Sequence, residues 1–208
     1  VMKQLKIKDL TVGTVLREIS LAKNNLIFVD EFIELFVGDK TMIKIADIYE
    51  RYDDLKFKKM LLDFDDLLIQ SYVLLRDNDK IRGNYQEMFN SILCDEFQDT
   101  NPCQLELLKL LINENKYNSS FWVAADDAQC IYSFAGSSVH NILNFKSMFP
   151  LSKQFILDLN FRSTKKIVRA CSNLSQHFKR QIHKEFKTNN IKGDDVIVLE
   201  SSNEMTEA

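Results

Sequence analysis

Glycine and proline are scarce in this 208-residue sequence, which has five Gly and two Pro, scattered rather than gathered into a linker. It contains no internal repeat or low-complexity tract, so solenoid and fibrous architectures are excluded. No apolar run approaches the roughly 20 residues that cross a bilayer, and the first residues lack the apolar segment of a secretory signal. We therefore expect a cytoplasmic protein with no membrane partner.

Cysteine is also sparse, and its four positions contain no C-x-x-C pair; they are Cys94, Cys103, Cys130 and Cys171. This spacing fits neither a zinc site nor a dense disulfide scaffold, so we expect reduced thiols. Hydrophobic residues, by contrast, make up 45% of the chain and include fifteen Phe. A chain of this length can bury roughly 70% of its unfolded surface, so a packed core is expected.

The net charge of −3 conceals an uneven distribution. Residues 61–130 contain 13 Asp and Glu against 5 Lys and Arg, a balance of −8. Residues 162–187 contain 8 Lys and Arg against one Glu, a balance of +7. An acidic middle and a basic later stretch are compatible with a cation site and a phosphate-facing surface, or with two solvated faces of opposite sign.

Apolar periodicity predicts helices over Thr14–Asn24, Val29–Phe36, Thr41–Lys59 and residues 61–75. After Gly83 the pattern changes to four short strand-like runs, at residues 91–95, 121–126, 154–159 and 195–200. Helices are expected to open at Asn101 with Pro102 in its first position, near Ser137 and near Ser163. Alternation of strands and helices predicts a parallel sheet, so the expected class is α/β with a helical N-terminal part.

The first strand-like run ends in Asp95-Glu96, within "SILCDEFQDTNPCQLELLKLL". In open parallel sheets ligands bind beyond the carboxyl ends of the strands. One carboxylate there can hold Mg²⁺ while its neighbour polarises an attacking water. The alternative is an Asp that only caps the next turn, and this motif alone does not decide between them.

The next two strand ends carry polar side chains at a repeated interval. Gln129 follows Asp95 by 34 residues, and Arg162 follows Gln129 by 33, each the length of one strand–helix–strand unit. An amide can contact a terminal phosphate without adding charge, and an Arg can clamp one. Phe134 is either a core residue or a platform for an unpaired base, and for Tyr132 a core position is preferred.

Four segments resemble, in order and spacing, the UvrD/Rep-type DNA helicases of superfamily 1: "DFDDLL", "ILCDEFQDTNPCQLELL", "VAADDAQCIYSFAGSS" and "LDLNFRST". The resemblance spans about residues 11–175. It implies a partial RecA-like sheet with crossover helices, preceded by a helical insertion domain. The expected domains are residues 1–60 (helical insertion), 61–160 (second half of the first motor domain) and 161–208 (a basic helix and strand beginning the next domain).

The resemblance also implies a role for each matching residue. Asp95 corresponds to the Walker B carboxylate that holds Mg²⁺, and Glu96 to the base for ATP hydrolysis. Gln129 corresponds to the glutamine that contacts the terminal phosphate, and Arg162 to an arginine that contacts the same phosphate. Phe161 takes the place of a tyrosine that stacks on adenine.

Two aromatic residues belong to the implied DNA face. Phe134 corresponds to a position that stacks on single-stranded DNA, and Tyr132 lies beside it in the same motif. Ala125, Ala128 and Ala135 depart from the family pattern, which has Gly, an acid and Arg at these positions. The replacement at Ala135 removes one polar link expected at the DNA face.

The sequence contains no G-x-x-x-x-G-K-[ST] loop to cradle phosphates. The implied parent is an ATP-dependent helicase that translocates 3′ to 5′ on single-stranded DNA, with the remainder of the helicase chain as partner. The 208 residues alone are expected to be inactive. Two alternatives to this interpretation stay open. One is a non-catalytic fragment or degenerate helicase relative that binds DNA or a partner protein, and the other is a metal-dependent nuclease built on the acidic cluster.

Overall fold

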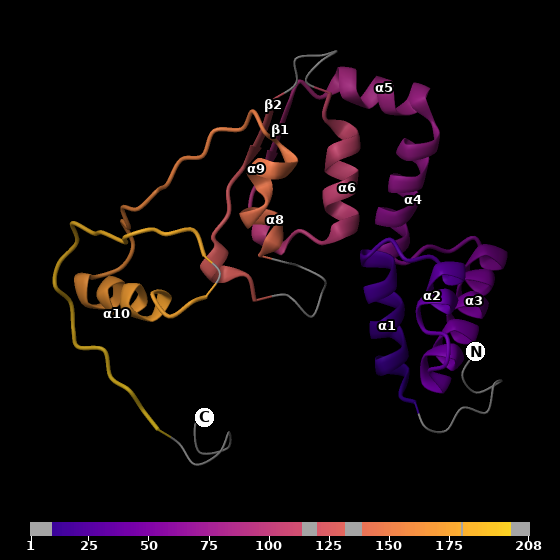
Figure 1. The fold of residues 1–208 in the computed structure, drawn as a ribbon, viewed down its shortest axis with the longest axis horizontal. Helices are drawn as coiled ribbons and strands as arrows, with labels where there is room; N and C mark the ends of the chain where they lie inside the picture. The colour runs from indigo at the N-terminus through magenta and orange to yellow at the C-terminus, as the bar shows by residue number, and fades with distance from the viewer. Residues whose placement is uncertain (1–9, 114–119, 132–138, 180, 201–208) are drawn as a thin grey trace. The chain divides into compact units, whose positions relative to one another are not determined.

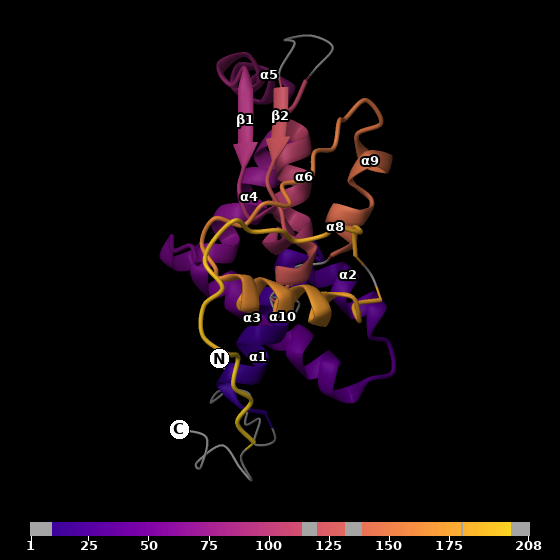
Figure 2. The same ribbon diagram turned by 90° about the vertical axis from the view of Figure 1, so that its left-hand side faces the viewer.

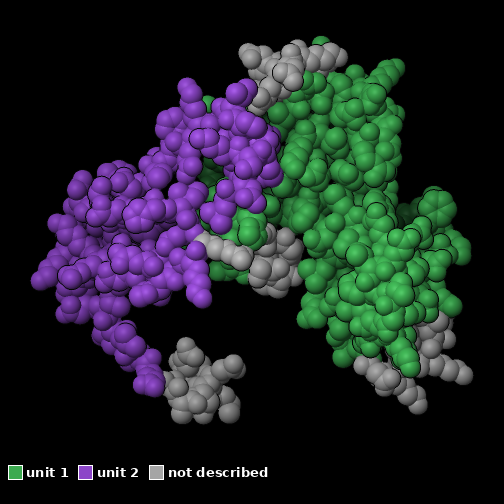
Figure 3. All heavy atoms as spheres, viewed as in Figure 1, with its two compact units in different colours: residues 1–142 green, residues 143–208 purple. Residues whose placement is uncertain are grey.

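The computed structural model describes residues 10–113, 120–131, 139–179 and 181–200, which form two compact units, residues 1–142 and 143–208 (Figure 3). The first unit begins with helices α1 (Val12–Asn24), α2 (Val29–Leu35), α3 (Lys40–Lys59), α4 (Phe64–Asp77) and α5 (Asp79–Met88). These bounds confirm the four helices expected from apolar periodicity. The domain boundaries expected at residues 60 and 160 stay a prediction.

The core of the helical start lies between α1, α2 and α3, and it consists of Val15, Ile19, Ala22, Phe32, Ile45, Ala46, Ile48 and Tyr49. Side chains three and four residues apart share one face of a helix, so α1 and α3 each contribute a stripe to this core, and α2 contributes Phe32. The ring of Phe32 meets that of Tyr49 edge to face, with 6.2 Å between centroids. Burial raises the pKa of the Tyr49 hydroxyl above its ordinary value.

A buried ionic cluster joins the helical start to the "DFDDLL" segment that opens α4. Lys23 and Lys56 reach the same three carboxylates, those of Asp53, Asp63 and Asp66. The ammonium of Lys23, which is 2% exposed, lies 2.6 Å from Asp66. Buried ions are tolerated when they are paired and hydrogen-bonded. The cluster therefore fixes α1 and α3 against the first turn of α4.

The second half of the first unit contains a two-stranded parallel sheet, β1 (Ser91–Cys94) and β2 (Ser120–Val123), drawn side by side in Figure 2. Between the strands come the 3-10 turn η1 (Phe97–Asp99) and helix α6 (Pro102–Leu111), and η2 (Asp127–Gln129) follows β2. Helix α6 opens as expected, with Asn101 as its cap and Pro102 in its first position. Helices α4 and α6 pack against each other (Figure 1).

The second unit contains α9 (Phe145–Met148) and α10 (Lys165–Ser175), and α8 (His140–Leu143) spans the boundary between the units. The strands expected at 154–159 and 195–200 are wrong: neither run is a strand, and only the isolated parallel bridge between Leu159 and Lys187 forms. A strand needs a partner ladder for its backbone, and within the described part of this unit neither run has one. Leu157 and Val198 are accordingly almost fully exposed.

All four cysteines are free thiols, as expected from their spacing. Burial raises the pKa of the Cys103 thiol to about 11, so this residue behaves as a neutral core side chain. Among the described residues, no helix combines the length and apolar character needed to cross a membrane.

Candidate functional site

The acidic pair lies where strand β1 ends, as the sequence predicts. Asp95 directly follows the last residue of β1, and one oxygen of its exposed carboxylate accepts the Glu96 backbone N–H at 2.9 Å. Glu96 has φ 49° and ψ 42°, in the left-handed region that residues other than glycine rarely adopt. Such a conformation costs on the order of 1–3 kcal/mol and persists where the surrounding contacts enforce it.

A buried glutamine, Gln98, holds the side chain of Glu96. Its side-chain amide N–H donates to the Glu96 carboxylate at 2.5 Å, and its carbonyl oxygen accepts the backbone N–H of Asp126 at 3.0 Å. Gln98 is only 1% exposed. One side chain therefore joins the acidic loop after β1 to the loop after β2. No role is predicted for Gln98 from the sequence, although its place two residues after the acidic pair could have indicated one.

The loops after the two strands are joined by the backbone as well. Ala124 donates its N–H to the carbonyl of Cys94 and accepts the N–H of Phe97, both at 2.9 Å. Because parallel strands end at the same edge of a sheet, these bonds place both loops at that edge.

Gln129, expected to lie near the acidic pair, follows β2 in the turn η2. Its side-chain amide donates to the Asp126 carboxylate at 2.8 Å, and the same carboxylate caps η2 by accepting the N–H of Ala128. Glu96, Gln98, Asp126 and Gln129 thus form one hydrogen-bonded series across the sheet edge. This series accounts for the position of Gln129, whose own side chain is exposed.

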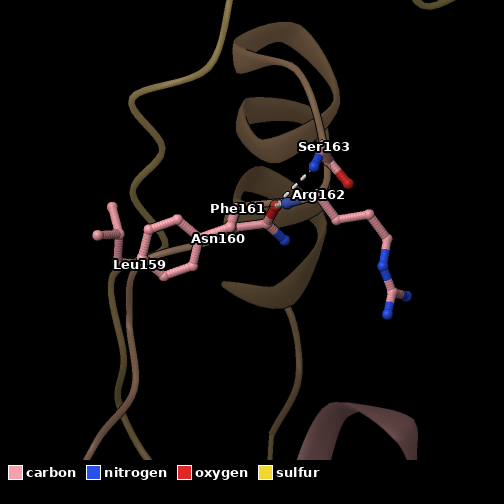
Figure 4. A pocket seen from close by; sticks show the side chains of 5 residues that line it. All are labelled: Leu159, Asn160, Phe161, Arg162 and Ser163. Atoms are coloured by element: carbon pink, nitrogen blue, oxygen red, sulfur yellow. Dashed lines mark hydrogen bonds between the residues drawn. The ribbon is translucent and has the colours of Figure 1, made fainter.

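Arg162 and Phe161 belong to the second unit, so their expected clustering with the acidic pair stays a prediction. The side chain of Asn160 accepts the backbone N–H groups of Arg162 at 2.9 Å and Ser163 at 2.7 Å, which holds this segment in a tight turn. The Arg162 side chain runs away from that turn (Figure 4). Residues Leu159–Ser163 line an open hollow of about 530 Å³.

Asn190, from a later segment of the second unit, hydrogen-bonds the backbone of this turn. The side-chain amide of Asn190 donates to the carbonyls of Phe161 at 2.9 Å and Ser163 at 3.0 Å. Phe161 is 79% exposed, and no hydrogen bond or ion pair of the Arg162 guanidinium is found among the described residues. The turn therefore exposes the ring of Phe161 and the guanidinium of Arg162 to solvent, while hydrogen bonds with the side chains of Asn160 and Asn190 hold its backbone. Phe134 and Tyr132, the expected DNA-contacting residues, lie outside the described residues.

The residues at the sheet edge fit a magnesium–nucleotide complex better than an all-protein metal cage. Within the described ranges, no three His, Cys, Asp or Glu side chains gather to hold a metal ion. Mg²⁺ in nucleotide sites is held by one or two carboxylates, with phosphates and waters as the other ligands. The exposed carboxylate of Asp95, at the end of β1, is of this kind.

The fold defines the class of the protein. It is an α/β protein with an acidic pair and a glutamine at the ends of its parallel strands. A family model of the UvrD/REP helicase N-terminal domain matches residues 2–150, and the chain belongs to this family. It is 37% identical over 176 residues to the ATP-dependent DNA helicase Rep of Buchnera aphidicola subsp. Acyrthosiphon pisum, covering 85% of this chain and 27% of that protein.

Two further relatives give the same result. The chain is 31% identical over 205 residues to the ATP-dependent DNA helicase PcrA of Bacillus subtilis, covering 99% of this chain and 27% of that protein. It is 37% identical over 164 residues to a probable DNA helicase II homolog of Mycoplasma capricolum, covering 78% of this chain and 22% of that protein. The chain spans about a quarter of the length of the curated relatives it matches.

Proposed function

We propose that this chain supplies half of the ATP site of a DNA helicase that translocates 3′ to 5′ on single-stranded DNA and unwinds duplexes. The observation that carries the proposal is the hydrogen-bonded series Glu96–Gln98–Asp126–Gln129 at the edge of the parallel sheet. It links the Glu96 carboxylate to the loop that carries the Gln129 amide, at the edge where the exposed Asp95 follows β1. The names of the family and its relatives support ATP and DNA as ligands.

In this proposal the residues at the sheet edge divide the work of ATP hydrolysis. Asp95 would hold Mg²⁺, which when bound would supply positive charge against the charge developing on the transferred phosphoryl group. Glu96 orients the attacking water and accepts its proton. Gln98 holds the Glu96 carboxylate through the 2.5 Å hydrogen bond, and because Gln98 is buried it limits rotation of that carboxylate. Gln129 is the residue whose amide meets the terminal phosphate.

In this proposal the second unit contributes residues that bind the phosphate, the adenine and the DNA. Arg162 offers a guanidinium with no partner among the described residues, the form suited to a bidentate phosphate contact. Phe161, exposed on the same turn, offers a ring on which adenine stacks. The +7 balance of residues 162–187 favours contact with the DNA backbone, and Phe134 and Tyr132 are the candidates for contact with bases. A cytoplasmic location with no membrane partner is part of this proposal.

The chain alone is expected not to turn over ATP. Phosphoryl transfer depends on positioning, and the sequence has no phosphate-binding loop with its Lys. A misplacement of about 1 Å can cost roughly a hundredfold in rate. The remainder of a helicase chain is therefore a required partner.

Phosphate release with magnesium, ATP and single-stranded DNA tests the proposal. The 208-residue chain should give none above background. The same chain joined to the phosphate-loop segment and the remaining motor segments of a relative should give DNA-stimulated release that Glu96→Gln abolishes. Release by the 208 residues alone that Glu96→Gln removes would contradict the expected inactivity. Equal release by the joined protein and its Glu96→Gln variant would contradict the role of Glu96.

A second candidate, a non-catalytic DNA-binding chain, is favoured by the exposed Phe161 and by the basic stretch 162–187, which begins with the exposed Arg162. This candidate expects oligonucleotide binding by the joined protein without any Glu96-dependent phosphate release. The same measurement therefore separates the two candidates.

A further inference from the structure

The last residue of α1, Asn24, connects the helical start to the loop that carries the acidic pair. It is 9% exposed, and its side-chain oxygen accepts a hydrogen bond from the Asn101 amide at 2.8 Å, across 77 residues of sequence. Its own amide nitrogen donates to Ser20 at 3.3 Å and to Asp65 at 3.4 Å. Asn24 thus contacts α4 through Asp65 and the start of α6 through Asn101.

The partners of the two amides fix their orientations. The Asn101 oxygen caps α6 by accepting the Gln104 backbone N–H at 2.9 Å, so its nitrogen faces Asn24. The Asp65 carboxylate, when ionised, only accepts hydrogen bonds, so the Asn24 nitrogen faces Asp65 and its oxygen faces Asn101. In the hydrogen-bonded series Asp65–Asn24–Asn101–Gln104, every donor therefore faces an acceptor.

Asn101 ends the same loop that begins with the acidic pair. The carbonyl of its neighbour Thr100 accepts the side-chain amide of Asn141 at 2.9 Å, and Thr100 donates its own N–H to the Phe97 carbonyl at 3.2 Å. Three residues before Asn101 lies Gln98, which holds Glu96 and the Asp126 backbone. The loop 95–101 is thus held at one end by β1 and at the other by the Asn24–Asn101 bond.

We propose that Asn24 is a positioning residue that couples helices α1–α3 to the acidic loop 95–101. Its bond to Asn101 sets where the loop ends, and the loop sets where Gln98 holds Glu96. A shift of α1 therefore reaches Glu96 without any contact between α1 and the nucleotide. The catalytic meaning of this coupling rests on the proposed function of Glu96, whereas the coupling itself is a property of the fold.

Hydrogen exchange of single amides in the 208-residue chain, measured by NMR under native conditions and without nucleotide, tests the coupling. The reporter is the Asp126 N–H, which is bonded to the Gln98 side chain. The reference is the Tyr49 N–H inside α3. Asn24→Ala should speed exchange of the reporter by about tenfold, the factor expected for one buried hydrogen bond, and leave the reference unchanged.

Two further variants separate positioning from general loss of stability. Arg17→Ala, at an exposed position of α1 whose side chain pairs with the neighbouring Glu18, should leave both amides unchanged. Asn101→Ser keeps an oxygen that caps α6 but removes the amide donor to Asn24, so it should speed the reporter while the Gln104 N–H stays protected. This variant also decides the matter should Asn24→Ala fail to fold.

Either of two results overturns the coupling: a reporter amide that Asn24→Ala and Asn101→Ser leave unchanged, or equal acceleration of the Tyr49 reference. Combining Asn24→Ala with Asn101→Ser should add nothing beyond either change alone, since both remove the same bond, and additive effects would contradict the proposal. If the exchange results hold while Glu96→Gln leaves phosphate release unaffected, the proposed function fails and the coupling stands.

Discussion

Gln98 holds Glu96: the buried amide donates to the carboxylate at 2.5 Å while its carbonyl oxygen accepts the N–H of Asp126. Gln98→Met keeps the volume of the side chain but removes both hydrogen bonds. It leaves the Asp126 N–H without its acceptor, which costs about 1–3 kcal/mol. Chemical denaturation should therefore show a lower free energy of unfolding by that amount.

Gln70→Met is the matched control, because Gln70 lies exposed on α4. Substitution at such a position usually changes the free energy of unfolding by less than about 0.5 kcal/mol. Equal effects of Gln98→Met and Gln70→Met would show that the link across the two loops contributes nothing to stability.

The ionic cluster at the start of α4 depends on both of its lysines. Lys23→Met keeps an apolar stem but leaves the carboxylates of Asp53, Asp63 and Asp66 to Lys56 alone. Removing one partner of a buried ion pair typically costs about 3–5 kcal/mol, so the thermal midpoint should fall markedly. Lys58→Met, at a lysine whose side chain is 73% exposed, should have little effect. A Lys23→Met protein as stable as the unchanged chain would exclude this role for the cluster.

Acid should weaken the same cluster. Burial by itself would raise the pKa of Asp63, but the hydrogen bond from Lys56 and the charge of Lys23 outweigh it and hold that pKa below its ordinary value. A carboxyl with a depressed pKa stabilises the fold above its unfolded-state pKa of about 4, and this contribution is lost as the pH falls below that value. The free energy of unfolding should therefore decline below about pH 4.

Asp63→Asn removes the titrating group but keeps a residue that caps α4. The variant should be less stable at neutral pH and should lose less of its free energy of unfolding on acidification. Identical pH profiles for the two proteins would show that Asp63 is not the titrating group.

Single-stranded DNA should bind weakly and in a salt-sensitive way to the basic stretch 162–187. Phosphate contacts release counterions, so affinity for a labelled oligonucleotide should drop between low and moderate salt. Phe134→Ala should cost roughly 1–3 kcal/mol of binding if a base stacks on that ring. An affinity that does not change with salt would exclude phosphate contacts as the cause.

The sequence predicted helices α1–α4 and the parallel pair β1–β2 but was wrong about the runs 154–159 and 195–200, for a physical reason. Helices such as α3 carry their own backbone hydrogen bonds, so apolar periodicity is enough to place them. The run 195–200 has the residue types of a strand, but a strand needs a partner, which a single run does not reveal. Apolar periodicity is therefore enough to place a helix, whereas a strand-like run predicts a strand only when a partner strand is also known.

Contacts over long sequence separations were missed entirely. The Asn24–Asn101 bond spans 77 residues and joins two side chains with no distinctive pattern around them. Lys23 was unexpected as a core residue because lysine is almost never buried unless it is paired, and its acidic partners lie on other helices. The places of the acidic pair after β1 and of Gln129 after β2, by contrast, could be predicted because each follows a strand-like run at one regular interval, while their roles stay predictions.

The most direct test of the proposed nucleotide site uses Mn²⁺ in place of Mg²⁺, together with ATP, and follows NMR line broadening in the 208-residue chain. Broadening depends on distance from the metal, so it registers even weak binding at a defined place. We predict that it centres on the amides of Asp95–Gln98 and Asp126–Gln129 and is lost in Asp95→Asn. Broadening centred on other carboxylates, such as Asp53 and Asp54, or unchanged in Asp95→Asn, would contradict a nucleotide site at the ends of β1 and β2.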